Sequence, residues 1–353
     1  MLNIELFQYF VRRKPMVQLS FEEAHKITND LKAYIGNYIF GQQELVDEAI
    51  CCLLSGGHIL MTGAPGLAKT TLVRVFSEKL GLNYGRIQFT PDLLPSDITG
   101  AEVLNIDPET SKRSFEFQKG PVFVNMLLAD EINRASPRTQ SALLEAMQEK
   151  TCTVAGTQHE LQLPFMVFAT QNPFESEGAF PLPEAQLDRF LVHSEVPYPD
   201  SDSEEKILMA HVESKLVGET KSEQKADDEK LSIEHVLGLI EAAKDIPVAS
   251  ELVTPIKDLV KSTRPEDELC PEDLKDSIWY GAGPRAGISL ISVSRAFALI
   301  CGDKEVRWHH IKRMAKPVLR HRVSLSSKAM RSDVTEDQLI DKLIVQVESK
   351  YNV

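Results

Sequence analysis

A short glycine-containing stretch, residues 63–70, has the residue types needed to hold a polyphosphate. It reads Gly-Ala-Pro-Gly-Leu-Ala-Lys-Thr after an apolar run, so a strand, a loop and a helix start are expected in that order. Backbone N–H groups of such a loop converge on phosphate oxygens, and the positive end of the helix faces the charge. Lys69 can reach the β- and γ-phosphates, and the Thr70 hydroxyl can complete a magnesium shell. The residues predicted to bind the nucleotide here are Gly63, Ala64, Pro65, Gly66, Leu67, Ala68, Lys69, Thr70 and Thr71.

The loop departs from the general G-x-x-x-x-G-K-[ST] pattern at one position, where Ala68 replaces the second glycine. Gly63 and Gly66 permit close approach of backbone to phosphate. Alanine tolerates a negative φ, so we expect residue 68 to lie already in the first helical turn. The stretch predicts a nucleoside triphosphatase, and a glycine-rich turn between core elements is the alternative.

Two adjacent carboxylates follow a second apolar run, residues 124–129. Asp130 and Glu131 would stand at the carboxyl end of a strand, where α/β sheets place their ligands. Asp130 suits a magnesium-sphere acceptor, and Glu131 suits the base that orients the attacking water. An acidic pair that merely starts the next helix is the alternative. Together with the phosphate loop, the pair favours hydrolysis of ATP to ADP with Mg²⁺ over nucleotide binding alone.

Composition restricts the class of protein. The 353 residues allow two domains, and the net charge of −13 argues against a mainly nucleic-acid-binding surface. No apolar run approaches the length of about 18 residues needed to span a bilayer, and the start of the chain does not resemble a secretory signal, so a cytoplasmic location is expected. The odd number of cysteines, without paired C-x-x-C spacing, favours free thiols in the core over a zinc site.

The pattern along the chain predicts an α/β domain followed by a helical one. Residues 20–23 form a capping box, and helices are expected over 24–35, 43–54 and 69–80. Apolar segments at 59–62, 86–89, 124–129 and 165–170 alternate with helical or loop stretches, which favours a parallel sheet flanked by helices. Helical patterns then dominate, at 204–213, 232–244, 251–262, 288–300 and 308–321, and a polar connection is expected at 218–230.

Five segments in a fixed order carry a resemblance to a known family. The phosphate loop is followed by Asp-Glu-Ile-Asn-Arg-Ala from residue 130, Ala-Thr-Gln-Asn-Pro from 169, Leu-Pro-Glu-Ala-Gln-Leu-Asp-Arg-Phe from 182 and Gly-Pro-Arg-Ala from 283. Over roughly residues 20–325 the chain resembles the MoxR family of AAA+ ATPases. This family uses the Gly-Leu-Ala-Lys-Thr form of the loop, so Ala68 is expected in it.

The resemblance implies a fold and a division of the chain. It implies a P-loop NTPase core of the AAA+ type over residues 20–198, with an N-terminal tail at 1–19 and a small all-α lid at 199–353. Within the core it implies an insert in the second helix, about 88–117. Residues 151–164 alternate around Gly156 and predict a β-hairpin, which in related ATPases faces the central pore and contacts clients. An ordinary loop and hairpin are the alternative.

The resemblance also implies roles for three residues outside the two motifs. Asn172 matches sensor 1, which contacts the γ-phosphate or the lytic water; capping of a turn before Pro173 is the alternative. Arg189 matches the arginine finger, supplied by a neighbouring subunit, and an ion pair on a helix surface is the alternative. Arg285 matches sensor 2, which reaches from the lid onto the nucleotide, unless it is a surface arginine.

Two further segments have weaker signals. Ile39, Phe40 and Gly41 stand where AAA+ proteins hold adenine, although an apolar turn before a helix would look the same. A basic run without acidic residues is interpreted first as the solvated face of a lid helix, and otherwise as a contact for an acidic subunit, partner or nucleic acid. Its cations are Arg307, Lys312, Arg313, Lys316, Arg320 and Arg322.

These features lead to one preferred function and three alternatives. The resemblance implies a homo-oligomeric ring, with a hexamer expected, that uses ATP to remodel or mature a client with a von Willebrand factor A domain, in some cases by inserting a metal or cofactor. A motor subunit of a magnesium chelatase is the first alternative. A DNA-directed AAA+ motor is disfavoured by the charge of −13. A nucleotide switch without hydrolysis is disfavoured by the full set of expected catalytic residues.

Overall fold

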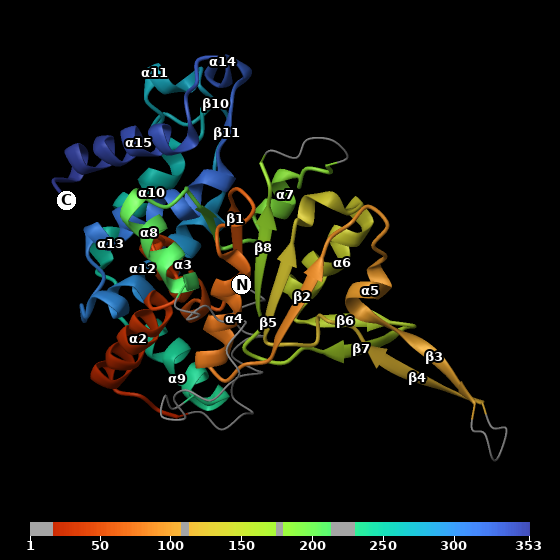
Figure 1. Cartoon of the computed structure of the whole chain (residues 1–353). Helices are drawn as coiled ribbons and strands as arrows, with labels where there is room; N and C mark the ends of the chain where they lie inside the picture. Colours follow the sequence, from red (N-terminus) through yellow and green to blue (C-terminus); the bar gives the residue numbers. More distant parts are fainter. Residues whose placement is uncertain (1–16, 107–112, 174–178, 213–229) are drawn as a thin grey trace.

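A five-stranded parallel sheet forms the centre of the N-terminal part of the molecule (Figure 1). The computed structural model describes residues 17–106, 113–173, 179–212 and 230–353, so residues 1–16 of the predicted tail and 218–229 of the predicted connection lie outside it. The strand order is β2-β5-β8-β1-β9, and every neighbouring pair is parallel. The strands are β1 (Ile59–Thr62), β2 (Tyr84–Gln88), β5 (Met126–Asp130), β8 (Met166–Gln171) and β9 (Val192–Glu195). The predicted parallel sheet is confirmed.

The central strands are apolar along their whole length because both faces of the sheet are covered. Met126 and Leu128 of β5 face one core with helices α2 (Phe21–Gly36), α3 (Gln43–Leu54) and α4 (Lys69–Lys79). Leu127 and Ala129 face a second core with α5 (Pro95–Thr99) and α6 (Pro137–Glu149). Alternate side chains of a strand point to opposite faces, so burial on both sides gives a continuous apolar run. Because all five strands are parallel, their carboxyl ends meet at one edge of the sheet, where both predicted motifs lie.

The predicted helix boundaries hold closely in this half. Ser20 caps α2: its Oγ accepts the N–H of Glu23 at 3.3 Å, and its own N–H donates to the Glu23 carboxylate at 2.9 Å. This reciprocal pair is the predicted capping box. Helix α3 begins and ends at the predicted residues, and α4 begins at Lys69.

Two β-hairpins leave the sheet domain at its lower end (Figure 1). The insert segment forms α5, β3 (Gly100–Ile106) and β4 (Arg113–Lys119), whose strands pair antiparallel. The predicted hairpin at 151–164 is confirmed as β6 (Thr151–Val154) and β7 (Thr157–Glu160). Its two turn residues, Ala155 and Gly156, both have positive φ, which suits the right-handed twist of a two-residue hairpin. The rings of Phe117 and His159 stack at 3.9 Å and join the two hairpins.

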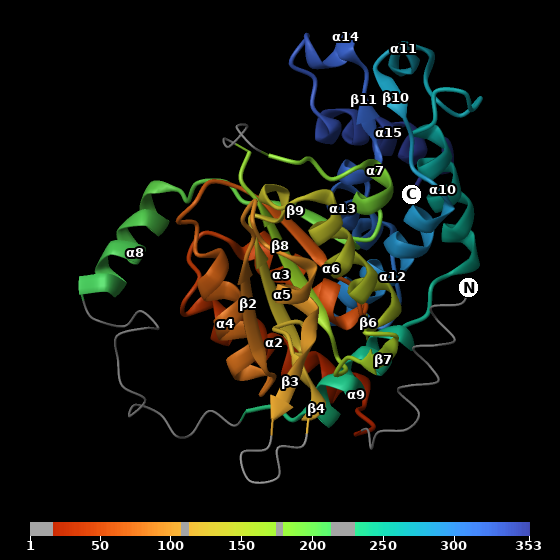
Figure 2. The same cartoon turned by 90° about the vertical axis from the view of Figure 1, so that its right-hand side faces the viewer.

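Most of the C-terminal part is built of helices that cover one side of the sheet domain (Figures 1 and 2), whereas α8 (Ser201–Val212) projects away from them in Figure 2. The five predicted helices correspond to α8 (Ser201–Val212), α9 (Ile233–Lys244), α10 (Ser250–Ser262), α12 (Pro284–Cys301) and α13 (Trp308–Leu319). The sequence patterns did not predict α11 (Glu272–Lys275), α14 (Ser327–Met330), α15 (Glu336–Tyr351) or the antiparallel pair β10 (Ile278–Tyr280) and β11 (Ser324–Leu325). The predicted boundary between the sheet domain and the helical lid, near residue 198, stays a prediction.

Helix α12 is the core helix of this lid. Among the described helices it alone has the length and apolar composition that a membrane span would need, with half of its residues buried inside the molecule. Its buried residues pack in one core with those of α3, α10 and α13.

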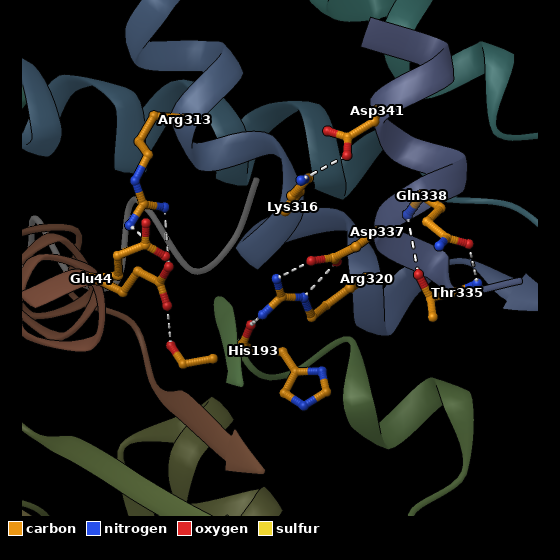
Figure 3. A network of polar contacts seen from close by, with 11 residues as sticks. Glu44, His193, Arg313, Lys316, Arg320, Thr335, Asp337, Gln338 and Asp341 are labelled. Carbon is orange, nitrogen blue, oxygen red and sulfur yellow. Dashed lines mark hydrogen bonds and ion pairs between the residues drawn. The ribbon is translucent and has the colours of Figure 1, made fainter. Parts of the chain in front are cut away.

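The basic run of the lid is solvated only in part: Arg307 and Lys312 are exposed, as interpreted, whereas for Arg313, Arg320 and Arg322 the interpretation as a solvated face was wrong. Figure 3 shows Arg313 beside Glu44 and Arg320 against Asp337. Arg320 makes two bonds to the Asp337 carboxylate, at 2.9 and 2.7 Å, and a third to the carbonyl of His193 in β9. Arg313, Arg320 and Arg322 lie at the junction between the lid and the sheet domain, and all six cations of the run are paired within the chain. The remaining pairs are Arg307 with Asp303, Lys312 with Glu348, Lys316 with Asp341 and Arg322 with Asp188.

Candidate nucleotide-binding site

An open pocket of about 430 Å³ lies at the carboxyl edge of the sheet, between β1, β5 and β8. The phosphate loop forms one wall, and the ends of β2, β5 and β8 form the other. The structure thus brings together both predicted motifs and Asn172, although they are far apart in sequence. The predicted site residues that line the pocket are Pro65, Gly66, Ala68, Lys69, Thr70, Thr71, Asp130, Glu131 and Asn172.

The backbone of the loop differs from the expectation at Ala68. This residue is the cap that precedes α4 and has φ +56° and ψ +15°, so it lies in the left-handed region and not in the first helical turn. The expected negative φ was wrong. A non-glycine residue in this region costs roughly 1–2 kcal/mol. The turn from strand to helix requires a left-handed residue at position 68, so the backbone of Ala68 is strained.

The two glycines of the loop are needed for different reasons. Gly66 has φ +84°, which favours glycine, and a Cβ there would meet no atom within 4 Å. At Gly63 a Cβ would lie 2.7 Å from the carbonyl oxygen of Val196, just after β9. Gly63 thus lets the loop pack against the neighbouring strand, a reason that the sequence pattern did not include.

Lys69 stands at the start of α4 with its ammonium group turned back over the loop. Its Nζ donates to the carbonyl of Gly63 at 2.6 Å. Burial lowers the pKa of Lys69, and the nearby carboxylates of Asp130 and Glu131 oppose this shift. Lys69 thus lines the pocket together with both carboxylates.

The carboxylate of Asp130 is held by two donors. Thr170 Oγ donates to Oδ1 at 2.6 Å, and Arg86 Nη2 donates to Oδ2 at 2.7 Å. Thr170 comes from the adjacent strand β8, and Arg86 from the edge strand β2. Together with the hydroxyl of Thr70, which also lines the pocket, Asp130 offers the oxygen ligands that Mg²⁺ prefers. The donor set fits a magnesium ion.

Glu131 follows in a left-handed backbone conformation, with φ +56°. Its N–H donates to Thr170 Oγ at 2.8 Å, so one threonine fixes both members of the acidic pair. Its carboxylate accepts from Gln88 Nε2 at 2.7 Å and from Arg134 Nη1 at 2.9 Å. The side chain is therefore oriented at the rim of the pocket.

Four of these residues were not among the predicted site residues: Arg86, Gln88, Arg134 and Thr170. Arg86 and Gln88 alternate along β2, and both line the pocket. A sequence signal was present, because two polar residues two positions apart at the end of a strand share one face. Thr170 had no such signal, since its role depends on the pairing of β8 with β5.

Eight other predicted residues do not line this pocket: three belong to the phosphate loop itself, and five come from elsewhere in the chain. The three loop residues are Gly63, Ala64 and Leu67. Arg189 donates to the carbonyl of Leu144 at 2.7 Å, and Arg285 pairs with Asp188 at 3.0 Å. None of the predicted adenine residues, Ile39, Phe40 and Gly41, lines it either. Ile39 is buried in the core, and Gly41 has φ +71°.

The described part of the chain contains one other cluster with metal-binding residue types, in the lid: Asp303, His309 and His310. The Nδ1 atom of His310 accepts the N–H of Arg307 at 2.9 Å, so its Nε2 carries the proton and donates to Asp303 at 3.0 Å. A protonated ring nitrogen is not a metal ligand. The cluster caps α13. Cys51, Cys52, Cys152 and Cys270 are buried, and Cys301 is exposed; all five are free thiols.

Comparison with known proteins agrees with this geometry. Residues 58–192 match the ATPase family associated with various cellular activities (AAA), and residues 272–343 match the AAA lid domain. The chain is 39% identical over 309 residues to the chaperone MoxR1 of Mycobacterium tuberculosis, which covers 88% of this chain and 78% of that protein. It is 28% identical over 313 residues to the MoxR protein of Paracoccus denitrificans, covering 86% and 90%.

A solved structure extends the comparison to the fold. A crystal structure from Cytophaga hutchinsonii, described provisionally as an ATPase, superposes with a TM-score of 0.81 at 35% identity. The match covers 92% of this chain and 96% of the other. With its phosphate loop, its acidic pair and its helical lid, the chain belongs to the MoxR family of AAA ATPases.

Proposed function

We propose that this chain hydrolyses ATP to ADP and phosphate with Mg²⁺ and uses the cycle as a chaperone-type motor. The observation that carries the proposal is that one and the same pocket is lined by Lys69, Thr70, Asp130, Glu131 and Asn172. A cation for the phosphates, oxygen ligands for a metal and a carboxylate for water are the groups that phosphoryl transfer needs.

Each side chain has a distinct task in this proposal. Lys69 neutralises charge on the β- and γ-phosphates, and Thr70 and Asp130 hold the metal. The bound magnesium ion would neutralise charge on the phosphates. Glu131 orients the attacking water and takes up its proton, and Asn172 contacts the water or the γ-phosphate. Ile39, Phe40 and Gly41 are proposed to hold the adenine.

We propose that two arginines complete the site of a neighbouring subunit in a homo-oligomeric ring, which we expect to be a hexamer. Arg189 and Arg285 do not line the pocket of their own chain, and the side chain of Arg285 is 62% exposed. A guanidinium that reaches the γ-phosphate from the next subunit stabilises the charge that develops during transfer. This direction for Arg285 differs from our expectation that it reaches its own nucleotide.

The work that the motor performs is proposed from family membership. We propose a cytoplasmic ring that remodels or matures a client with a von Willebrand factor A domain, with metal or cofactor insertion as one form of this work. The MoxR1 match over 88% of the chain supports a chaperone role more than a magnesium-chelatase motor. The net charge of −13 disfavours a DNA-directed motor.

Two substitutions test the proposed chemistry. Glu131→Gln should bind a fluorescent ATP analogue like the wild type but lose hydrolysis by about 100-fold or more, because the amide cannot take up the proton of the water. Lys69→Ala should lose tight ATP binding, and chelation of magnesium should stop hydrolysis by the wild type. Equal hydrolysis by wild type and Glu131→Gln would refute the assigned base. Proteins retained by Glu131→Gln in the presence of ATP, but not ADP, would identify the client.

A further inference from the structure

A single carboxylate, that of Asp188, lies between two guanidinium groups of the lid. Asp188 follows the short helix α7 (Glu184–Leu187) and directly precedes Arg189. Its Oδ2 accepts from Arg285 Nη1 at 3.0 Å, and its Oδ1 accepts from Arg322 Nε at 2.8 Å. Each oxygen therefore serves a different lid element, α12 for Arg285 and the turn after α13 for Arg322.

Arg322 makes this junction rigid. Its side chain is only 3% exposed, and its Nη2 donates to the carbonyl of Phe190 at 2.8 Å. Its Nη1 donates to the carbonyl of Leu191 at 3.3 Å and to that of Val318, within α13, at 2.5 Å. Residues 188–191 are thus bound to the lid on both sides of Arg189. A movement of the lid must move this segment with it.

The charges at this junction are not balanced. Within the described residues, Asp188 is the one carboxylate that pairs with any of Arg189, Arg285 and Arg322. Two guanidiniums, those of Arg285 and Arg322, face this one negative charge, which leaves an excess of one positive charge, and Arg189 adds a further cation next to Asp188 in the chain. Arg285 remains largely exposed at this point. An anionic group from outside the chain would complement this surface.

We propose that Asp188 is a positioning residue, which holds Arg285 against the segment that carries Arg189 and links this segment to the lid through Arg322. This inference rests on the proposed function, in which both arginines meet the triphosphate of a neighbouring subunit. One carboxylate would set the distance between the two arginines and their orientation towards the phosphates. A shift of about 1 Å in such groups can reduce a rate about 100-fold.

The test is Asp188→Asn, with Asp337→Asn as the matched control. The asparagine oxygen can still accept from Arg322, while its NH₂ group would face Arg285 and break that pair alone. Asp337 is a carboxylate of similar exposure, 28% against 34%, that pairs with Arg320 in the same interface between lid and sheet. We expect Asp188→Asn to lower kcat about 10- to 100-fold with ATP affinity of the subunit unchanged, and Asp337→Asn to leave kcat within about twofold.

Mixed rings separate positioning from general damage. Asp188→Asn subunits keep an intact phosphate loop, and Lys69→Ala subunits keep well-placed arginines. A mixture of the two should hydrolyse more ATP than the sum of the separate proteins. A kcat for Asp188→Asn equal to that of Asp337→Asn would overturn the inference, as would a mixture without any gain. Should Asp188→Asn fail to fold, Asp188→Glu, which keeps the charge but moves it by one methylene, must lower kcat in the same way or the inference falls.

One further mixture keeps this inference distinct from the proposed function. Arg189→Ala combined with Lys69→Ala tests only whether the arginine acts across the interface. No recovery there, with rings assembled as judged by mass photometry, would contradict the shared site itself. Recovery there, together with full activity of Asp188→Asn, would contradict the role of Asp188 alone.

Discussion

The Nε2 atom of Gln88 lies 2.7 Å from Oε2 of Glu131 and donates a hydrogen bond to it. Gln88 is the last residue of the edge strand β2 and pairs in register with Asp130. The same carboxylate oxygen accepts from Arg134 at 2.9 Å. Two donors on one oxygen thus fix the direction in which the proposed base points, and neither of them belongs to the phosphate loop.

We predict that Gln88→Ala lowers kcat about 10-fold while ATP affinity stays close to that of the wild type. The loss of one donor lets the Glu131 carboxylate rotate, and the alignment of a catalytic base contributes factors of this size. Lys69 and the loop are untouched. Steady-state hydrolysis with titration of a fluorescent ATP analogue measures both quantities. A large loss of affinity with unchanged kcat would show that Gln88 acts on binding instead.

The positive φ values of the phosphate loop lead to a pair of opposite predictions. Ala68→Gly should raise the free energy of unfolding by about 0.5–1 kcal/mol, because it removes the strain of alanine at φ +56°. Gly66→Ala should lower the free energy of unfolding by about 1 kcal/mol, because alanine is strained at φ +84°. The loss is no larger, since no atom lies within 4 Å of the new Cβ. Urea denaturation of the nucleotide-free proteins measures both. Changes of the same sign in the two variants would contradict the assigned backbone.

The parts of the site that could be predicted from the sequence are those encoded by neighbouring residues. The loop and the acidic pair each lie within one short segment, and the alternation of strands and helices was visible around them. Thr170 and Arg86 reach Asp130 across 40 and 44 residues, through the pairing of strands that no local pattern reveals. The sign of φ at Ala68 was missed for another reason: the residue type favours the helix, but the turn overrides that preference.

The lid and the strand it binds were predicted less completely, because the contacts between them are charged and distant in sequence. Strand β9 of the sheet has only four residues, among them His193, Ser194 and Glu195, and lacks an apolar run. It is recognisable only through its neighbour β1 and the lid arginine that binds it. Arg313, Arg320 and Arg322 looked like part of a solvated face because their acidic partners lie elsewhere in the chain.

A pH prediction follows from His193, whose Nε2 lies 2.8 Å from the Thr62 hydroxyl at the end of β1. Burial, with the nearby Arg320 guanidinium, lowers the pKa of His193 from 6.5 to about 3. The unfolded chain then binds the extra proton first, so stability falls as the pH falls from about 6.5 towards 3. His193→Gln should lose less stability than the wild type between pH 7.5 and 5.0, by no more than about 2 kcal/mol. Parallel stability curves for the two proteins would contradict it.

A buried ion pair joins Arg313 of the lid to Glu48 of α3. Figure 3 shows Arg313 beside the neighbouring Glu44. Glu48 is 5% exposed; its carboxylate accepts from Arg313 Nη1 at 3.1 Å and from the hydroxyl of Ser194 in β9. Burial raises the pKa of Glu48, and the charge of Arg313 opposes this shift. The pair therefore joins α13 to α3 with little water around the carboxylate.

Arg313→Met should lower the free energy of unfolding by about 3 kcal/mol, because it leaves a buried carboxylate without its cation. The double variant Glu48→Gln with Arg313→Met should recover part of that loss, since the uncompensated charge is gone. Lys316→Met is the control: it lies in the same helix and pairs with Asp341 at 2.8 Å, but Lys316 is only partly buried and Asp341 is exposed, so a cost of about 0–1 kcal/mol is expected. Equal costs for Arg313→Met and Lys316→Met in urea denaturation would show that burial of Glu48 does not control the attachment of the lid.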